Sequence, residues 1–259
     1  MKLNLYQIDA FAKNIFEGNP AAVCPLDKWL DDSIMQKIAN ENNLSETAFF
    51  VKEDKSYHIR WFTPSSEVDM CGHATLASAY VLFEILKYSE KEILFNSKSG
   101  ILKVTKNQDK YQMDFPITKI EKCNIPDNLI NAFTIKPIEC YKSMDYILVF
   151  ENEEDIINAI PNLELLKNID TRGVIITAKS QKYDFVNRMF APKYGIDEDP
   201  VTGSAFTQLI PYWNKKLNKN TFIAKQVSQR GGEVFCTLQN NRVQISGYGK
   251  KYLEAIIEL

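Results

Sequence analysis

Apolar and polar side chains alternate over residues 3–8, which predicts that the chain begins with a β-strand. A helix is predicted next, because the apolar side chains of residues 34–39 fall on one stripe of a helical period. Asp31 or Asp32 can cap the start of this helix. The early part of the chain therefore combines a strand pattern with a helix pattern.

Two later stretches predict β-hairpins, because apolar runs flank short groups of turn-forming residues. The first hairpin pairs Ile101–Val104 with Tyr111–Phe115 across an Asn-Gln-Asp turn. The second pairs Glu233–Leu238 with Arg242–Ser246 across an Asn-Asn turn. The mixture of strands and helices predicts an α/β architecture.

The segment from Ala74 to Leu86 is apolar nearly all round, with Glu84 as its single charged residue. A helix of this composition is expected to be buried on every side. A second segment, Gly203–Trp213, has a similar character, although Pro211 is expected to kink or shorten it. The chain thus predicts two central helices that other elements surround.

An internal repeat relates the surroundings of these two segments. Arg60–Pro64 reads RWFTP, and Arg188–Pro192, about half the chain further on, reads RMFAP. Each copy is followed by an acidic loop and then by a Gly-x-Ala group, Gly72–Ala74 in the first half and Gly203–Ala205 in the second. Each match is short and has a chance explanation, but the shared order favours two related halves.

The repeat extends upstream, where Ser45–Thr47 before one apolar run corresponds to Thr171–Gly173 before another. We therefore expect two pseudo-symmetric halves, 1–116 and 117–259, each with curved strands around a central helix. In this arrangement the final strand can cross back to the first half. The two helix starts are expected to face one another across a cleft.

Composition narrows the class of protein. The 259 residues are 45% hydrophobic and 25% charged, with a formal net charge of −2, which gives no basic surface for nucleic acid or an anionic membrane. The start lacks the apolar core of a signal peptide, and no apolar run is long enough to span a bilayer. The five cysteines are scattered and odd in number, which favours reduced thiols in a cytoplasmic protein.

Several short motifs together resemble the phenazine-biosynthesis-protein-F-like (PhzF-like) family, and they occur in the order of that family along nearly the whole chain. The motifs are Gly18–Val23, Ser45–Phe49, Arg60–Pro64, Cys71–Thr75, Asp114–Pro116 and Glu198–Ala205. The resemblance implies a diaminopimelate epimerase-like fold, a site between two halves, a homodimer, and no metal or organic cofactor. The best-understood member of the family isomerises trans-2,3-dihydro-3-hydroxyanthranilate.

The resemblance makes Glu46 the candidate general acid/base, since the acid/base glutamate of the family falls at this position. Desolvation in an apolar cleft raises the pKa of a carboxyl group toward a useful range. Asp199 matches a family aspartate near the reacting atoms. The alternatives are a solvated surface carboxylate for Glu46 and a helix cap for Asp199.

Gly72, His73, Gly203 and Ser204 open the two central helices, where free N–H groups favour an anion. We expect them to bind a substrate carboxylate, with His73 positioning the substrate or relaying a proton. Asn19 is a further candidate substrate-binding residue. The alternatives are glycines that only permit tight turns and a buried structural histidine.

Cys71 separates two mechanisms. Cysteine-dependent racemases and epimerases of this fold resemble the chain here, but they need a second thiol, and Asp199–Val201 stands at the equivalent place. The phenazine-pathway enzyme has no cysteine at the position of Cys71, which puts the identity of the substrate in question.

The sequence therefore predicts an isomerase that shifts a proton on a small carboxylate, without a metal or a cofactor. A one-base racemase or epimerase, and a non-catalytic small-molecule-binding protein on the same fold, remain the alternatives.

Overall fold

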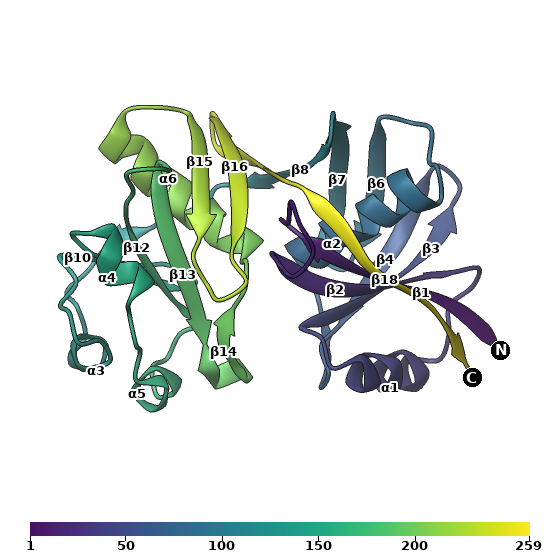
Figure 1. The fold of residues 1–259 in the computed structure, drawn as a ribbon, viewed down its shortest axis with the longest axis horizontal. Coiled ribbons are helices and arrows are strands. Elements are labelled where there is room, and N and C mark those ends of the chain that lie inside the picture. The colour runs from purple at the N-terminus through teal and green to yellow at the C-terminus, as the bar shows by residue number, and fades with distance from the viewer. The chain divides into compact units, whose positions relative to one another are not determined.

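The computed structural model describes residues 1–259, which form two compact units (Figure 1). Unit 1 comprises Met1–Asp114 and Ser246–Leu259, and unit 2 comprises Phe115–Ile245. The chain leaves unit 1 along strand β8, Lys110–Pro116, and returns along strand β17, Arg242–Gly247. The last strand, β18, Gly249–Glu258, therefore belongs to unit 1.

Unit 1 is built mainly of strands. Its remaining elements are β1 Lys2–Ala10, β2 Asn19–Leu26, α1 Asp32–Asn42, β3 Glu46–Glu53, β4 Ser56–Phe62, β5 Glu67–Val68, α2 Gly72–Tyr80, a π-helical turn Val81–Ile85, β6 Glu92–Ser97 and β7 Gly100–Asn107. The predicted first strand, first helix and first hairpin are all confirmed. Asp31 occupies the N-cap position of α1, although its side chain makes no capping hydrogen bond.

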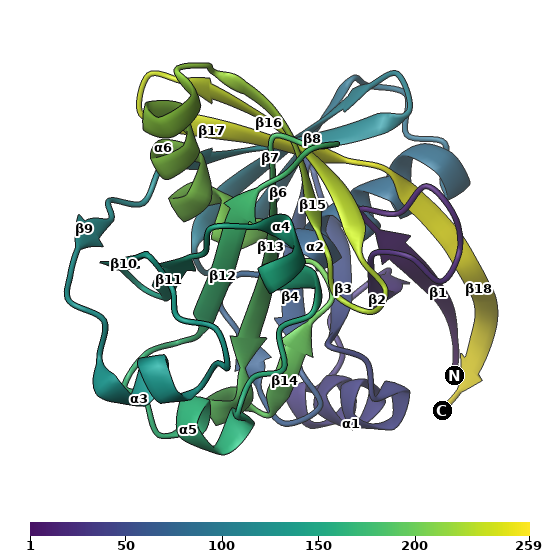
Figure 2. The same cartoon turned by 60° about the vertical axis from the view of Figure 1, so that its left-hand side comes forward.

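Unit 2 carries more short helices. Its elements are β9 Glu121–Lys122, α3 Asp127–Asn131, β10 Glu139–Lys142, β11 Tyr146–Val149, α4 Glu153–Ile157, α5 Leu163–Lys167, β12 Val174–Lys179, β13 Phe185–Ala191, a 3-10 turn Pro192–Tyr194, β14 Ile196–Asp199, a 3-10 turn Gly203–Ala205, α6 Phe206–Leu217, β15 Thr221–Gln226 and β16 Gly232–Gln239. Strands β12, β13 and β15 lie side by side in Figure 2.

The pairing of the strands repeats between the units. In unit 1, β2 is parallel to β3, β3 antiparallel to β4, β4 parallel to β6 and β6 antiparallel to β7. In unit 2, β11, β12, β13, β15 and β16 follow the same alternation. The helix between the third and fourth of these strands is α2 in one unit and α6 in the other. The repeat seen in the sequence is therefore a repeat of topology, and the predicted α/β class is confirmed.

Helix α2 is buried from His73 to Ala79, as its apolar composition predicts. Two hydroxyl groups within it donate to backbone carbonyls one turn earlier, Thr75 to Cys71 and Ser78 to Ala74. These bonds satisfy polar groups that burial would otherwise leave unpaired. The other face of strands β1–β4 is covered by α1, whose buried Met35 and Ile38 pack against them.

Helix α6 differs from its prediction, because it continues through Pro211 to Leu217. A proline removes the hydrogen bond to the carbonyl four residues earlier, here that of Thr207. In the structure the Thr207 carbonyl instead accepts the backbone N–H of Thr118 at 3.0 Å. The lost partner is replaced from another segment, and the helix is not shortened at the proline.

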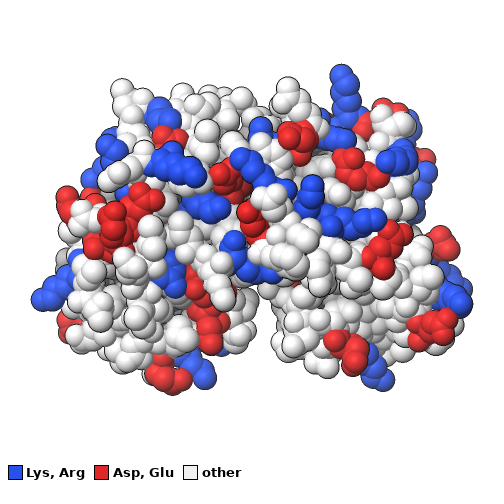
Figure 3. Space-filling view, viewed as in Figure 1, with Lys and Arg blue, Asp and Glu red and all other residues white.

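The last features of the fold are its surface charge and the length of its helices. Acidic and basic side chains are interspersed on the face of each unit that Figure 3 shows. No helix of the structure is both long and apolar enough to cross a bilayer.

Candidate active site

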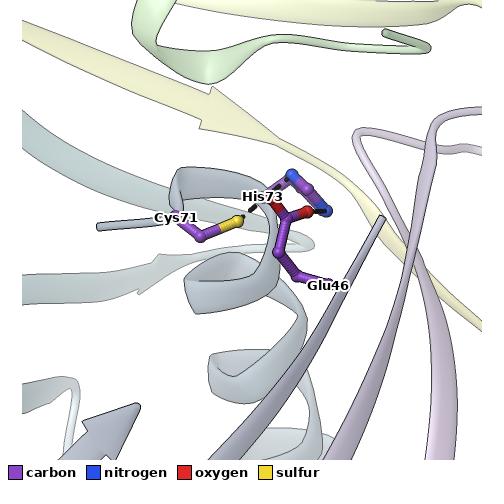
Figure 4. A group of neighbouring side chains, drawn as sticks. All are labelled: Glu46, Cys71 and His73. Atoms are coloured by element: carbon purple, nitrogen blue, oxygen red, sulfur yellow. Dashed lines mark hydrogen bonds and ion pairs between the residues drawn. The ribbon is translucent and has the colours of Figure 1, made fainter. Parts of the chain in front are cut away.

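In unit 1 the candidate acid/base lies against the start of the buried helix. Glu46 is the first residue of β3, and its Oε2 atom is 3.1 Å from Nε2 of His73 in the first turn of α2 (Figure 4). The two side chains are only 13% and 7% exposed. Neither of these two atoms has an aligned hydrogen-bond partner, although buried polar atoms usually have one. The contact is therefore a close approach of charges rather than a saturated hydrogen bond.

The other ring nitrogen of His73 has different neighbours. Its Nδ1 atom lies 3.4 Å from the Cys71 thiol and 3.4 Å from the amide nitrogen of Asn19. Asn19 begins β2, whose parallel register with β3 pairs Ala21 with Glu46. The strand pairing therefore brings the starts of β2 and β3 to the same end of helix α2.

The turn before β2 requires glycine. Gly18 has φ of +67°, and a Cβ atom there would lie 2.1 Å from the carbonyl oxygen of Ala10. Any other residue would combine a left-handed backbone with a clash against backbone atoms. Gly18 thus fixes the path that brings Asn19 to His73.

Burial and charge set the protonation of this cluster. Burial is the main cause that raises the pKa of Cys71 to about 11, and the Glu46 charge acts in the same direction. Burial alone lowers the pKa of His73, but its neighbours Cys71 and Glu46 outweigh burial and hold the pKa well above 6.5. Because Cys71 is a neutral thiol at pH 7, the charge that favours an imidazolium there is that of Glu46.

The three side chains are also close enough to be considered as metal ligands. One donor atom from each of Glu46, Cys71 and His73 lies within 4.8 Å of the other two. The thiol faces Nδ1 of the imidazole, however, whereas the carboxylate faces Nε2. A metal bound at one ring nitrogen would therefore lie beside one of the other two ligands and further from the second. The donors therefore fit a bridging histidine better than a shared metal centre.

In unit 2, Asp199 and Ser204 lie on either side of a tightly held turn. The Thr202 hydroxyl donates to Oδ2 of Asp199. The alternative role for this carboxylate was a cap of the following helix. The buried Gln226 side chain donates to the Asp199 carbonyl at 2.6 Å and accepts the Thr202 N–H at 3.0 Å. Asn187, also buried, donates to Gln226. These bonds fix the segment that carries both candidate residues.

A second network, anchored on the buried Asp145, holds Ser204. The hydroxyl oxygen of Ser204 accepts from Nη1 of Arg172 at 2.9 Å. Arg172 forms a two-point ion pair with the fully buried Asp145, which also accepts from Gln208. The Asp145 pair raises the pKa of Arg172, against the lowering effect of burial, and the Asp199 charge contributes in the same direction.

The structure thus gathers the predicted residues into two groups. Glu46, His73 and Asn19 meet in unit 1 beside Gly72, and Asp199 and Ser204 share one turn with Gly203 in unit 2.

Sequence reasoning missed the polar side chains that support the second group, Asn187, Gln208, Gln226, Asp145 and Arg172. Arg172 had one signal, since it stands in the repeat where Glu46 stands in the first half.

Two surface hollows lie elsewhere. One of about 600 Å³ is lined by Tyr183, Asp184 and Ile223 among others, and a second of about 360 Å³ by Leu3, Pro25 and other residues of unit 1. Neither contains a candidate site residue. The chemistry of the side chains, rather than the size of a hollow, therefore identifies the site.

Comparison with known proteins gives the family. The phenazine biosynthesis-like protein family matches residues 8–254. An uncharacterized isomerase of Pseudomonas aeruginosa is 48% identical over 259 residues, and the alignment covers 100% of both proteins. A crystal structure of a PhzF family protein from Enterococcus faecalis is 48% identical, has a TM-score of 0.98 and covers 100% of both chains. The chain belongs to the PhzF-like family of phenazine biosynthesis-like proteins.

More distant structures agree on the fold. A predicted epimerase of Pseudomonas aeruginosa has a TM-score of 0.76 at 20% identity, with 98% of this chain and 99% of that chain covered. At this identity the likeness shows the fold alone, which is the diaminopimelate epimerase-like α/β fold that the motifs imply. The family and its isomerase relatives make the chain an enzyme of the isomerase type.

Proposed function

We propose that the protein is a cofactor-independent isomerase that shifts a proton on a small carboxylate-bearing substrate, with Glu46 as the general acid/base. The observation that carries the proposal is the 3.1 Å approach of Glu46 Oε2 to His73 Nε2 at a nearly buried position. Both atoms lack an aligned hydrogen bond, so the hydrogen-bonding capacity of both is unsatisfied within the protein. Buried carboxylate and imidazole groups are the usual agents of proton transfer.

The protonation of the pair suggests the direction of the first step. The raised pKa of His73 makes it an imidazolium at neutral pH. Glu46, facing that cation, accepts a proton from a carbon next to a carboxylate or an unsaturated system. The same carboxyl group then returns the proton to another carbon of the substrate. A single carboxyl group works from one side of the substrate, which favours transfer on the same face over inversion.

Substrate binding is assigned to the helix starts and their neighbours. In this proposal Gly72 and Gly203 offer backbone N–H groups, and Ser204 its hydroxyl, to the substrate carboxylate. Developing negative charge is stabilised by the same donors and by His73. Glu46 takes no part in holding the anion, because its own charge opposes it.

The remaining roles follow from the same chemistry. Asn19, beside His73, contacts the substrate. Asp199, fixed by Thr202 and Gln226, is a second carboxyl group for the reacting atoms. The proposal requires that these unit 2 residues and Glu46 act on one substrate in a cleft between the two halves, as the sequence repeat predicts. A cytoplasmic homodimer completes the proposal.

A screen for solvent-deuterium incorporation tests the function. Small unsaturated and hydroxylated carboxylic acids are incubated in D₂O with the wild-type protein or with Glu46→Gln, and are then analysed by mass spectrometry and NMR. We expect wild type to place deuterium on at least one compound and Glu46→Gln to leave that compound unlabelled. Equal labelling by both proteins would exclude Glu46 as the proton carrier.

The same samples distinguish the alternatives. A shift of a double bond with retained geometry supports the isomerase, whereas inversion at a stereocentre supports a one-base epimerase. Ligand binding without turnover, unaffected by Glu46→Gln, supports a non-catalytic binding protein. The fold is shared with a predicted epimerase, so inversion is the rival that the screen must examine first.

A further inference from the structure

The contact between Arg172 and Ser204 in unit 2 is the counterpart of the contact between Glu46 and His73 in unit 1. Glu46 and Arg172 occupy equivalent positions of the repeat. Glu46 is the first residue of β3, and Arg172 lies two residues before the equivalent strand β12. His73 and Ser204 are the middle residues of the two Gly-x-Ala groups. Each unit thus joins the head of one strand to the start of its central helix, through unlike side chains.

Arg172 is held on two sides. Its backbone N–H bonds to the Met144 carbonyl, and the Tyr146 N–H bonds to the Gly173 carbonyl at 3.0 Å, which places Arg172 beside Asp145. The Nε and Nη2 atoms then bind both oxygens of Asp145. Asp145 is 0% exposed and is itself held by Gln208 at 2.6 Å. The guanidinium is therefore fixed before any ligand arrives.

The third bond of the guanidinium determines what Ser204 can do. A serine hydroxyl has one hydrogen and two lone pairs, whereas a guanidinium has five N–H donors and no acceptor. Because Nη1 donates to Ser204, the hydroxyl proton cannot point back at Arg172 and must be directed to another acceptor. A cationic donor on its oxygen also makes the hydroxyl a stronger donor.

We propose that Arg172 is a positioning residue, which fixes the Ser204 hydroxyl as a hydrogen-bond donor to an anionic group of the substrate. The inference rests on the proposed function only in taking that anionic group to be a carboxylate. Asp145 and Gln208 act one step further away, by fixing the guanidinium. If Arg172 only neutralised Asp145, its Nη1 atom would not need to contact Ser204, because Nε and Nη2 already bind both oxygens of Asp145.

The first measurement needs no ligand. Neutron diffraction from deuterated wild-type crystals locates the hydroxyl deuterium of Ser204. We expect it to point away from Nη1 of Arg172, with both Nη1 deuteriums visible. A deuterium that points toward Arg172, or an Arg172 side chain that does not contact Ser204, would overturn the inference whatever the protein catalyses.

The second measurement uses benzoate as the anionic probe and benzamide as its uncharged counterpart. NMR titration of the Gly203 and Ser204 amide signals gives the dissociation constant for wild type, Ser204→Ala, Arg172→Met and the double variant. Each single variant should weaken benzoate binding about tenfold, the loss of one hydrogen bond to a charged group. Arg172→Met should have little further effect when Ser204 is already Ala.

Controls separate positioning from stability. Arg188 forms a similar two-point ion pair with Glu198, so Arg188→Met reports the cost of losing a half-buried arginine of unit 2. Arg172→Lys keeps the charge but loses the planar fork, and should retain only part of the benzoate affinity.

The outcomes are distinct. A further tenfold loss in the double variant would mean that Arg172 binds the anion directly, and would overturn the positioning role. An Arg172→Met protein that binds benzoate as tightly as wild type would also overturn the positioning role. If wild type does not bind benzoate while the hydroxyl points as expected, the inference on Arg172 stands and the carboxylate part of the proposed function fails.

Discussion

Oε2 of Glu46 lies 3.1 Å from Nε2 of His73, although Glu46 begins a strand and His73 lies in the first turn of a helix. Nδ1 of the same ring faces the Cys71 thiol. His73 therefore stands between an acid and a thiol, and its charge affects both.

The raised pKa of His73 has a measurable consequence. The two histidines give separate imidazole signals in an NMR titration, and His58→Gln identifies the signal of His73. We expect the His73 signal to titrate at a pH clearly above 6.5, because the Glu46 charge stabilises the imidazolium. A midpoint at or below 6.5 would show that desolvation dominates at this position.

Stability should follow the same titration. Because the folded-state pKa of His73 lies above the unfolded value near 6.5, the folded protein holds this proton more tightly. The resulting stabilisation is complete below pH 6.5, decreases as the pH rises above that value, and is lost once the pH passes the folded-state pKa. Urea unfolding of wild type and His73→Gln across this range measures it, and a difference that grows with pH would contradict the assignment.

Cys71 is expected to be dispensable for the chemistry. Its pKa of about 11 keeps it a thiol at neutral pH, and a thiol is a poor nucleophile and base. Cys71→Ala should retain most of the deuterium incorporation, as should Cys24→Ala, which replaces another buried cysteine. A loss with Cys71→Ala as large as that with Glu46→Gln would point to a thiol mechanism.

We expect the purified protein to contain no stoichiometric metal. The reason is that the Cys71 thiol and the Glu46 carboxylate each approach a different nitrogen of His73. Elemental analysis of wild type and His73→Gln, after purification without chelators, checks this. One equivalent of a transition metal in wild type and none in His73→Gln would establish a metal site at this cluster.

Gly18 should tolerate no side chain. Gly18→Ala is expected to lower the free energy of unfolding by more than about 1 kcal/mol, since it adds a clash to a left-handed backbone. Gly195→Ala is the matched control, because Gly195 has a similar φ of +79° and open space around its Cβ position. Equal losses in urea unfolding would mean that the contact with the Ala10 carbonyl is relieved by a small shift.

Much of the fold could be predicted, because its signals are local. Alternating and helical patterns mark the first strand, the first helix and both hairpins. The repeat predicted equivalent halves, and the strand pairings of the two units match one for one. The path of α6 through Pro211 could not be predicted, because the replacement donor comes from Thr118, far away in sequence.

The site was predictable only where a motif marks it. The motifs single out Glu46 and His73, and the structure brings them into contact. Asp145 and Arg172 lie 27 residues apart, and although the repeat includes Arg172, nothing in the sequence marks Asp145 as its partner; their ion pair appears only when β11 and β12 are paired. Supporting residues of this kind depend on tertiary contacts, which one sequence does not display.

The central claim is that Glu46 carries the proton. The most direct measurement is the rate of solvent-deuterium incorporation into the compound that the screen identifies, compared among wild type, Glu46→Gln and Glu53→Gln. Glu53 ends the same strand on the exposed side, so its variant controls for the loss of a carboxylate from β3.

We expect Glu46→Gln to incorporate deuterium at least about 100-fold more slowly than wild type, because it lacks the general acid/base. The rate for Glu53→Gln should equal that of wild type, and urea unfolding should show Glu46→Gln to be folded. A folded Glu46→Gln protein that incorporates deuterium at the wild-type rate would contradict the account.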